Sequence, residues 1–357
     1  MRSKILLLGV TCLVVVAACG DGGGGADTIE PGGTATTGGE GGPELDSLTV
    51  ITASRDAGSN GPFIIGTGKG FFAEEGLEVE VAISDDPRPA LVGDSAQVAV
   101  LEVPYTAQAV AEDIDLVAFA GFRCVEPYMI GVQPDMDSVE DLAGENVFLN
   151  GVPGDPVVDY RLSLMADAGW DMSTVDVEYV QISGDNLAWV EQWTTGAIAV
   201  TPFYREDLPV LEEHGVNVVV NELISWPNEV MVAKRSFVEE NPETVERFVR
   251  GMLKSVAWYS DLDNKDEFLE MARTQDYPVE QAERDYASGP YLFCENLYVS
   301  VEEANRQLEV QQVPGSPDFA DFSLLDGLKA AQESMGLDNE PPSVPPDPNL
   351  GLEDAEG

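Results

Sequence analysis

The sequence predicts an α/β protein with mostly parallel sheets flanked by helices, followed by a wholly helical C-terminal region. Short β-rich segments alternate with helical segments from Leu48 to Val220, a pattern typical of βαβ units. From Asn241 onward the apolar residues recur only at helical spacing. The chain has 357 residues, 44% of them hydrophobic, which is enough for one large domain or for two lobes with a substantial core.

The predicted strands are short apolar runs rich in β-branched residues. They cover residues 48–52, 77–81, 98–103, 116–120, 146–149, 177–180, 197–200 and 216–220. Residues 54–61 are predicted to form a turn, and helical spacing covers residues 62–75, 155–168, 185–193 and 205–214. Asn241-Pro242-Glu243 predicts a further helix, because it places an N-cap before a proline at the first helical position.

The charge of the chain excludes some classes of partner. With 65 acidic against 18 basic residues, the formal net charge is −47. A nucleic-acid-binding face needs clustered lysine and arginine, so we expect no nucleic acid partner and no charge-driven adhesion to anionic lipid. A saline habitat and an ordinary acidic extracytoplasmic protein both remain open as explanations of the acidic excess.

The N-terminus has the layout of an export signal. Residues 1–18 contain a short basic region and an apolar run too short for a good membrane span. The segment that ends in Ala18-Cys19 resembles the bacterial lipobox, so we expect Cys19 to be acylated, with an ordinary signal peptide as the alternative. Residues 19–46 are predicted to form a glycine-rich flexible tether, and residues 338–357 a disordered, acidic, proline-rich tail.

The remaining cysteines are Cys124 and Cys294. An even pair outside the cytoplasm favours a disulfide over two buried thiols. His214 is the single histidine, and it precedes a glycine, so we expect it at the C-terminus of a helix. The spacings match no zinc pattern, and we expect neither a metal site nor a cofactor.

One segment resembles a known family closely. Residues 69–81, KGFFAEEGLEVEV, resemble the signature of type II periplasmic binding proteins, closest to the family that binds nitrate, sulfonates, taurine and thiamine-pyrimidine precursors. Residues 138–144, 228–233 and 237–245 resemble further segments of that family in the right order, so that the resemblance spans about residues 47–275. The family feeds ABC importers, which implies a permease and its ATPase as partners.

The resemblance implies a two-lobed fold with a ligand cleft. Lobe I is expected to comprise residues 47–127 and 225–337, including a return strand and the C-terminal helices, and lobe II residues 128–224. The chain should cross near residues 125–130 and return near residues 225–230. In open α/β sheets ligands bind beyond the carboxyl ends of the strands, so the loops there are the site candidates.

We expect the site residues in those loops. Glycines let the backbone approach a ligand, amides and arginines bind polar groups, and aromatic rings stack. Arg123 is predicted to hold a charged group of the ligand, and Asp155 either to contact the ligand or to cap its own helix. Trp189 and Trp193 are predicted to pack within a helix. The candidates are Arg55, Asn60, Gly61, Phe63, Tyr105, Phe122, Arg123, Gly154, Asp155, Thr201, Phe203, Tyr204 and Trp226.

The predicted function is that of a monomeric, lipid-anchored solute receptor on the extracytoplasmic face of the cell membrane, which delivers a small organic solute to an ABC permease. An anion such as a sulfonate, taurine, a carboxylate or nitrate is favoured. A thiamine-pyrimidine precursor or similar planar heterocycle is the alternative. A sensory receptor lipoprotein remains open, and a pyrimidine-synthase-like enzyme is disfavoured because one histidine leaves no catalytic constellation.

Overall fold

The computed structural model describes residues 46–338, apart from residues 85, 184–185, 205–206, 280–282, 284–285, 287–291, 295 and 314. The predicted signal peptide, the lipidation site Cys19, nearly all of the predicted tether and the acidic tail lie outside the described residues. Contacts divide the chain into two units, residues 1–42 and 43–357, and the described residues all belong to the second.

One eight-stranded mixed sheet runs through the described part of the chain, in the order β2-β1-β3-β8-β4-β7-β5-β6. Its strands are β1 (Asp46–Thr52), β2 (Leu77–Ile83), β3 (Val98–Glu102), β4 (Leu116–Val132), β5 (Asn146–Val147), β6 (Glu178–Tyr179), β7 (Val200–Phe203) and β8 (Asn217–Lys234). The strands β2, β1 and β3 are parallel to one another, and so are β6, β5 and β7. Antiparallel pairing of β4 and β8 with their neighbours joins the two groups.

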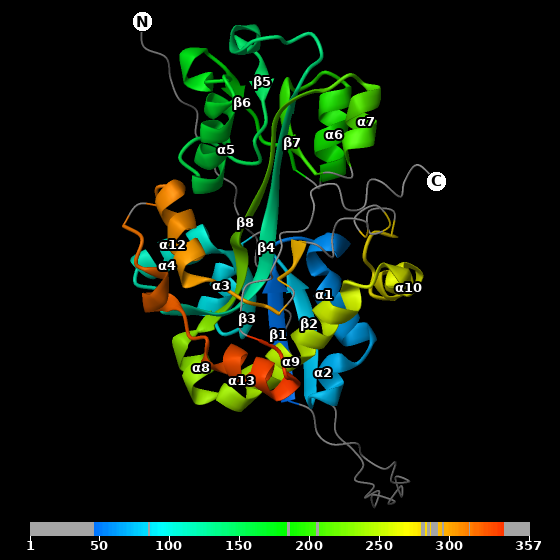
Figure 1. The fold of residues 1–357 in the computed structure, drawn as a ribbon, viewed down its shortest axis with the longest axis vertical. Helices are drawn as coiled ribbons and strands as arrows, with labels where there is room; N and C mark the ends of the chain where they lie inside the picture. Colours follow the sequence, from blue (N-terminus) through cyan, green and yellow to red (C-terminus); the bar gives the residue numbers. More distant parts are fainter. Residues whose placement is uncertain are drawn as a thin grey trace, which may run out of the picture. The chain divides into compact units, whose positions relative to one another are not determined.

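The strands β4 and β8 belong to both lobes, and Figure 1 shows them running from the lower group of elements to the upper one. The predicted two-lobed α/β fold is confirmed, with both lobes sharing one sheet. The predicted strands at residues 116–120 and 216–220 cover only the first parts of β4 and β8, which have 17 and 18 residues. Each continues because the two pair from Leu116↔Lys234 to Val132↔Asn217, which satisfies their backbone hydrogen bonds.

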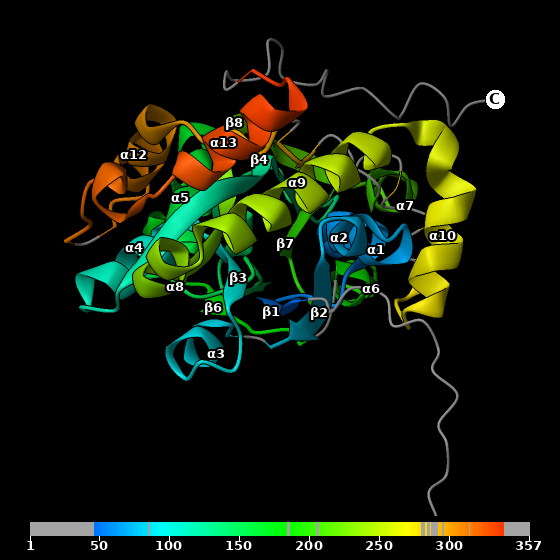
Figure 2. The same cartoon turned by 90° about the horizontal axis from the view of Figure 1, so that it is seen from below.

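Lobe I has a hydrophobic cluster on each face of its sheet. Val98 and Val100 of β3 pack with the helices of one face, whereas Ala99 and Leu101 pack on the other face. Figure 2 shows α9 between α13 and the α1–α2 pair, all of which it contacts. The first face carries α1 (Ala57–Gly68), α2 (Phe71–Glu74), α8 (Arg235–Glu240), α9 (Pro242–Tyr259), α10 (Lys265–Thr274) and α13 (Asp326–Met335). The second carries α3 (Arg88–Val92), α4 (Val103–Ala111), α12 (Val301–Val310) and the 3-10 helix η6 (Phe319–Phe322).

Lobe II also has a hydrophobic cluster on each face of its sheet, and its strands β5, β6 and β7 are shorter than those of lobe I. Tyr128, Ile130 and Val132 of β4 pack in one cluster, and Met129 packs in the other. The first cluster includes α5 (Pro156–Asp167) and the 3-10 helices η1 (Val139–Leu142) and η2 (Met172–Thr174). The second includes α6 (Asn186–Thr194) and α7 (Leu208–Glu213), and His214 is the C-cap of α7, as predicted.

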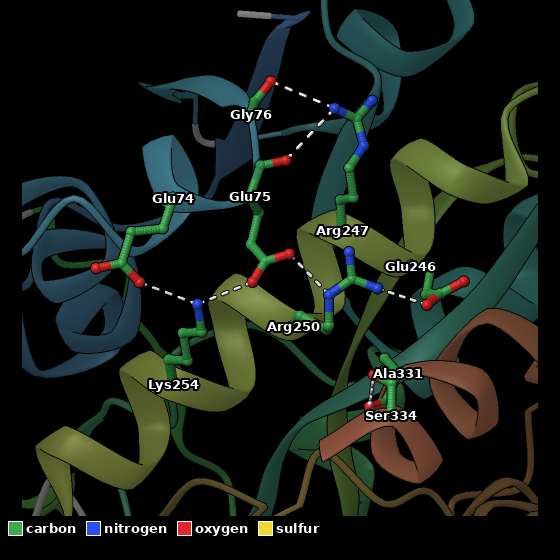
Figure 3. A network of polar contacts seen from close by, with 9 residues as sticks. All are labelled: Glu74, Glu75, Gly76, Glu246, Arg247, Arg250, Lys254, Ala331 and Ser334. Carbon is green, nitrogen blue, oxygen red and sulfur yellow. Dashed lines mark hydrogen bonds and ion pairs between the residues drawn. The ribbon is translucent and has the colours of Figure 1, made fainter.

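Two segments that carry the family resemblance meet in lobe I (Figure 3). The carboxylate of Glu75, at the end of α2, lies 2.7 Å from Arg250 Nε and 2.8 Å from Lys254 Nζ, both on α9. Arg247, one turn earlier on α9, donates to the backbone carbonyls of Glu75 and Gly76. The signature at residues 69–81 and the helix that begins at Pro242 therefore form one ion-pair network that fixes α2 on α9.

We expect Glu75→Gln to lower the free energy of unfolding at pH 7 by about 1–3 kcal/mol, because the Glu75 side chain is only 11% exposed and binds two cations. Burial by itself raises the pKa of Glu75, but hydrogen bonds from Lys254 and Arg250 outweigh it and hold the pKa below its usual value. The stabilisation is therefore fully present above the unfolded pKa of 4.5 and is lost as the pH falls through the lower folded pKa.

Urea unfolding of the wild type and the variant between pH 7 and pH 3 measures this difference. The matched control is Glu74→Gln, because the Glu74 side chain is 59% exposed and pairs with Lys254 alone among the described residues, so its effect should stay below about 1 kcal/mol. Equal effects of the two substitutions at pH 7, or a Glu75 effect that does not decrease as the pH falls from 7 to 3, would contradict the assigned network.

The C-terminal region returns to the sheet beside β4. Gly121 donates its backbone N–H to Leu297 (2.9 Å), and Cys294 donates its own to Phe122 (3.1 Å). A Cβ at Gly121 would lie 2.5 Å from the carbonyl oxygen of Tyr298, so only glycine fits this close approach. The Cα atoms of Cys124 and Cys294 are 5.0 Å apart there, within the range of a disulfide.

Candidate ligand-binding site

The two lobes approach each other where α4 and α5 begin. The phenol of Tyr105, in the first turn of α4, donates to Oδ2 of Asp155 over 2.7 Å. Asp155 is the N-cap of α5, and its Oδ1 accepts from the N–H of Val157 at 3.0 Å. The carboxyl ends of β3 in lobe I and of β5 in lobe II lead into these helices, so the contact lies at the strand ends where α/β sheets bind ligands.

Several features keep the Tyr105 phenol protonated. Burial, the negative charge of Glu102 and the hydrogen bond to Asp155 all raise the pKa of Tyr105 above its ordinary value. The phenol therefore donates to the carboxylate throughout the physiological pH range. Gly154, predicted as a contact, is exposed beside this bond with a φ of 99°, and its N–H donates to Asp159.

The segment after β1 differs from the predicted turn at residues 54–61. Helix α1 begins already at Ala57, because both carboxylate oxygens of Asp56 accept backbone N–H groups in its first turn, from Gly58 at 3.0 Å and Ser59 at 2.8 Å. Asn60 is fully buried, and its amide bonds to Ser54, Asp56 and Thr52. The predicted amide of Asn60 is thus engaged within lobe I.

Arg55 precedes this helix and is exposed. Its positive charge acts on Tyr277, whose pKa is raised by burial and partly lowered again by Arg55. Among the described hydrogen bonds and ion pairs, none involves Arg55. The structure therefore shows no partner for Arg55 among the described residues, and its contact with a solute stays a prediction.

Three charged residues form a row across the strands that the lobes share. Glu102 of β3 pairs in register with Glu229 of β8, and Glu229 pairs with Arg123 of β4. The Nε of Arg123 lies 3.9 Å from Oε2 of Glu229, and the Arg123 side chain is only 7% exposed. The structure thus places the predicted ligand arginine in a largely buried ion pair where the chain crosses between the lobes.

A small pocket lies within lobe II. Its volume is about 10 Å³, and most of its lining is aromatic. The Tyr204 and Trp189 rings lie 6.5 Å apart at an angle of 27°, and the Arg161 guanidinium lies 5.9 Å from the ring centre of Tyr128. The positive charge of Arg161 also lowers the pKa of Tyr105, which places this pocket close to the contact between the lobes. The lining residues are Tyr128, Met129, Arg161, Trp189, Pro202, Phe203 and Tyr204.

Several other residues that the sequence predicts as ligand contacts are packed in the interior of the lobes. Phe63 and Phe122 stack on each other at 5.2 Å in the lobe I core. A Cβ at Gly61 would lie 2.6 Å from the Tyr259 ring, so this glycine allows α1 to approach α9. Thr201 is fully buried, and its hydroxyl donates to the carbonyl of Pro202. The side chain of Trp226 lies outside the described part of the chain.

The structure therefore joins Tyr105 and Asp155 at the contact between the lobes and places Phe203 and Tyr204 in the lining of the lobe II pocket. It also adds residues that the sequence did not single out as ligand contacts. Arg161 lies in the second turn of α5, where a polar residue usually indicates a solvated face. Trp189, predicted to pack, does pack against Phe148, but it also lines the pocket. No local pattern distinguishes either residue, because the pocket forms only when α5, α6, β4 and β7 assemble.

The described residues contain no group of three or more histidine, cysteine or acidic side chains placed to hold a metal ion. Within the same residues, no helix is both long enough and apolar enough to cross a membrane.

A two-lobed α/β fold with candidate contacts from both lobes defines a solute-binding protein. The chain belongs to the family described as NMT1/THI5 like, whose model matches residues 59–262, more than half of the chain. It is 26% identical over 259 residues to the formylaminopyrimidine-binding protein of Halalkalibacterium halodurans, and this alignment covers 70% of this chain and 72% of that protein. It is 24% identical over 285 residues to the riboflavin-binding protein RibY of Chloroflexus aurantiacus, and this alignment covers 76% of this chain and 78% of RibY.

The solved structures agree on the fold. The periplasmic nitrate-binding protein NrtA of Synechocystis PCC 6803 superposes with a TM-score of 0.62 over 85% of this chain and 93% of its own, at 14% identity. At that identity the likeness shows the fold alone. A desulfurization enzyme, DszB, shares the architecture as well, so the fold does not by itself exclude catalysis.

Proposed function

We propose that this protein captures a planar nitrogen heterocycle, such as a pyrimidine, between its two lobes and delivers it to an ABC permease. The observation that carries the proposal is the aromatic lining of the lobe II pocket beside Arg161. Because the pocket admits only a small substituent, the planar ring itself would lie at its mouth, against these aromatic side chains. The pyrimidine- and riboflavin-binding relatives support the same class of ligand.

The hydrogen bond between Tyr105 and Asp155 supports binding by closure. It joins the first turn of α4 in lobe I to the N-cap of α5 in lobe II. A solute that contacts both lobes stabilises the closed form relative to the open form, and this bond adds to that preference. The ring would lie beside this contact, with lobe I below it and the aromatic pocket above it.

An anion, which the sequence favoured, has weaker support. Helix N-termini are good anion sites only while their N–H groups are free. At α1 and α5 the carboxylates of Asp56 and Asp155 already accept N–H groups. Glu102 and Glu229 add two more carboxylates close by. These negative charges suit a solute that carries hydrogen-bond donors better than they suit a sulfonate or nitrate, although Arg55 and Arg161 keep an anion as the second candidate.

Native mass spectrometry of protein purified without refolding should detect a co-purified heterocycle. Calorimetric titrations with formylaminopyrimidine, the amine left after removal of its formyl group, riboflavin, taurine and nitrate should then show binding of a heterocycle only. Binding of taurine or nitrate with no binding of any heterocycle would replace this proposal with the anion.

Two further classes of function are distinguishable. If genes for a permease and an ATPase lie next to this gene, they would support transport. If both are absent and a gene for a membrane signalling protein lies there instead, a sensory receptor would be supported. Catalysis is disfavoured because His214 is exposed at the end of α7, where its Nδ1 lies 2.9 Å from the carbonyl of Val210, and because the two similar proteins described above are named for binding.

We also propose that the protein is a monomer held at the extracytoplasmic face of the membrane by lipid on Cys19, and that Cys124 and Cys294 form a disulfide. The variant Cys19→Ser should release the protein into the medium or leave the precursor uncleaved, because serine cannot receive the thioether-linked lipid. Membrane fractionation and intact mass measure this outcome. A wild-type protein that is soluble and lacks acyl mass would contradict the anchor.

A further inference from the structure

We propose that Arg161 and Trp189 form a donor subsite in lobe II, which binds one hydrogen-bond acceptor on a substituent of the solute, such as a carbonyl oxygen. The inference rests on the proposed function and names the chemistry that selects the ligand. It follows from three properties of the pocket: an indole N–H and an arginine that have, respectively, no acceptor and no carboxylate partner among the described residues, and a very small volume.

The indole N–H of Trp189 lacks an acceptor. The Trp189 side chain is 9% exposed, its Nε1 is shielded from solvent, and no described residue accepts a hydrogen bond from it. A buried donor without an acceptor is unfavourable, and native proteins keep few of them. Trp189 lines the pocket. We take its Nε1 to face the pocket, where an acceptor would satisfy this donor.

Arg161 has no carboxylate partner within 4.0 Å in the described part of the chain, although 65 acidic residues are available. One of its donors, Nη1, binds the carbonyl of Leu149 at 2.8 Å, which fixes the side chain. The guanidinium has five N–H donors and no acceptor, so the others remain for a ligand. Other basic residues, in contrast, have carboxylate partners, among them Lys69, Arg88, Lys234, Arg235, Arg250 and Lys254.

The volume of the pocket limits what enters it. A space of about 10 Å³ holds roughly one water-sized group, so a ring is excluded and a single substituent atom fits. A group with lone pairs satisfies both donors, whereas an amino group would place its own N–H against them. The subsite should therefore prefer a solute with a carbonyl over the matching amine by about tenfold or more, which corresponds to one charge-assisted hydrogen bond.

Formylaminopyrimidine and the amine left after removal of its formyl group test this preference. Calorimetry of the wild type should give tighter binding of the formylated compound. In Trp189→Phe, which keeps the aromatic ring and removes the N–H, the formylated compound should lose about tenfold in affinity while the amine is unchanged. Arg161→Met should act in the same direction.

The matched control is Trp193→Phe. Trp193 is on the same helix, is fully buried and also has an indole N–H without an acceptor among the described residues, but it does not line the pocket. Its substitution should leave the preference intact. In a ¹H–¹⁵N spectrum, the Trp189 indole signal, assigned by its loss in Trp189→Phe, should move downfield with the formylated compound, while the Trp193 signal stays in place.

The outcomes separate the two proposals. Binding of neither compound to the wild type overturns the heterocycle and this inference together. Equal affinity for both compounds, equal effects of the Trp189 and Trp193 substitutions, or an unmoved Trp189 signal overturns the donor subsite and leaves the proposed function standing.

Discussion

Replacing Arg123 with alanine should lower the free energy of unfolding of the solute-free protein by about 2–5 kcal/mol. The substitution leaves Glu229, whose side chain is 20% exposed, without its cationic partner, and Glu102 lies next to it across the sheet. Two neighbouring carboxylates in a largely buried place repel each other once the arginine is gone. Urea unfolding of the wild type and the variant at pH 7 measures the loss.

Two matched variants test the cause. Arg123→Ala combined with Glu229→Gln should recover part of the loss, because the uncompensated charge is removed as well. Arg273→Ala removes an arginine that is 57% exposed and pairs with Glu270, so it should cost less than about 1 kcal/mol. Unchanged stability of Arg123→Ala together with abolished solute binding would instead show that Arg123 holds the ligand, as the sequence predicts.

Preventing the bond between Cys124 and Cys294 should have an effect of similar size. The two residues are 170 positions apart, and the chain-entropy model gives about 5 kcal/mol for a loop of this length. The double variant Cys124→Ser/Cys294→Ser should unfold at a correspondingly lower urea concentration than the non-reduced wild type. The segment that includes Cys294 would lose its covalent link to β4 and keep the backbone hydrogen bonds beside Gly121.

A reductant provides the internal control. It should lower the stability of the wild type to that of the double variant and leave the double variant unchanged. Peptide mapping without reduction should find one linked pair of peptides that contains Cys124 and Cys294. Two unlinked peptides, or a wild type that does not respond to reductant, would contradict the disulfide.

Local signals predicted much of the fold. The strand–helix alternation and the start of α9 at Pro242 were readable because they depend on neighbouring residues. The start of α1 was misread, because glycines at positions 58 and 61 and Pro62 indicate a turn, whereas the carboxylate of Asp56 caps a helix there. The length of β4 and β8 was also missed, because the second half of each strand is stabilised by pairing with the other strand.

The candidate site was predicted only in part. Tyr105, Asp155 and Tyr204 follow strands, and Phe203 is the last residue of β7, so the rule for α/β sheets selected them as candidates. The same rule also selected Asn60, Phe63 and Phe122, which the structure places in the core with their polar or aromatic groups already engaged. A position near a strand end shows which part of the fold a residue lies in. The direction in which its side chain points depends on the packing around it.

The sequence by itself determined the α/β architecture, the family and the strand ends where a solute would bind, because each depends on local periodicity or on a contiguous motif. The tertiary structure decided which charges are paired and which are free. Arg123 and Arg161 look alike in the sequence, yet Arg123 faces Glu229 across the sheet, whereas Arg161 binds a carbonyl and lines a pocket with Trp189. That difference arises from contacts between segments far apart in the chain, since burial and charge pairing depend on distance in space and not on position in the sequence.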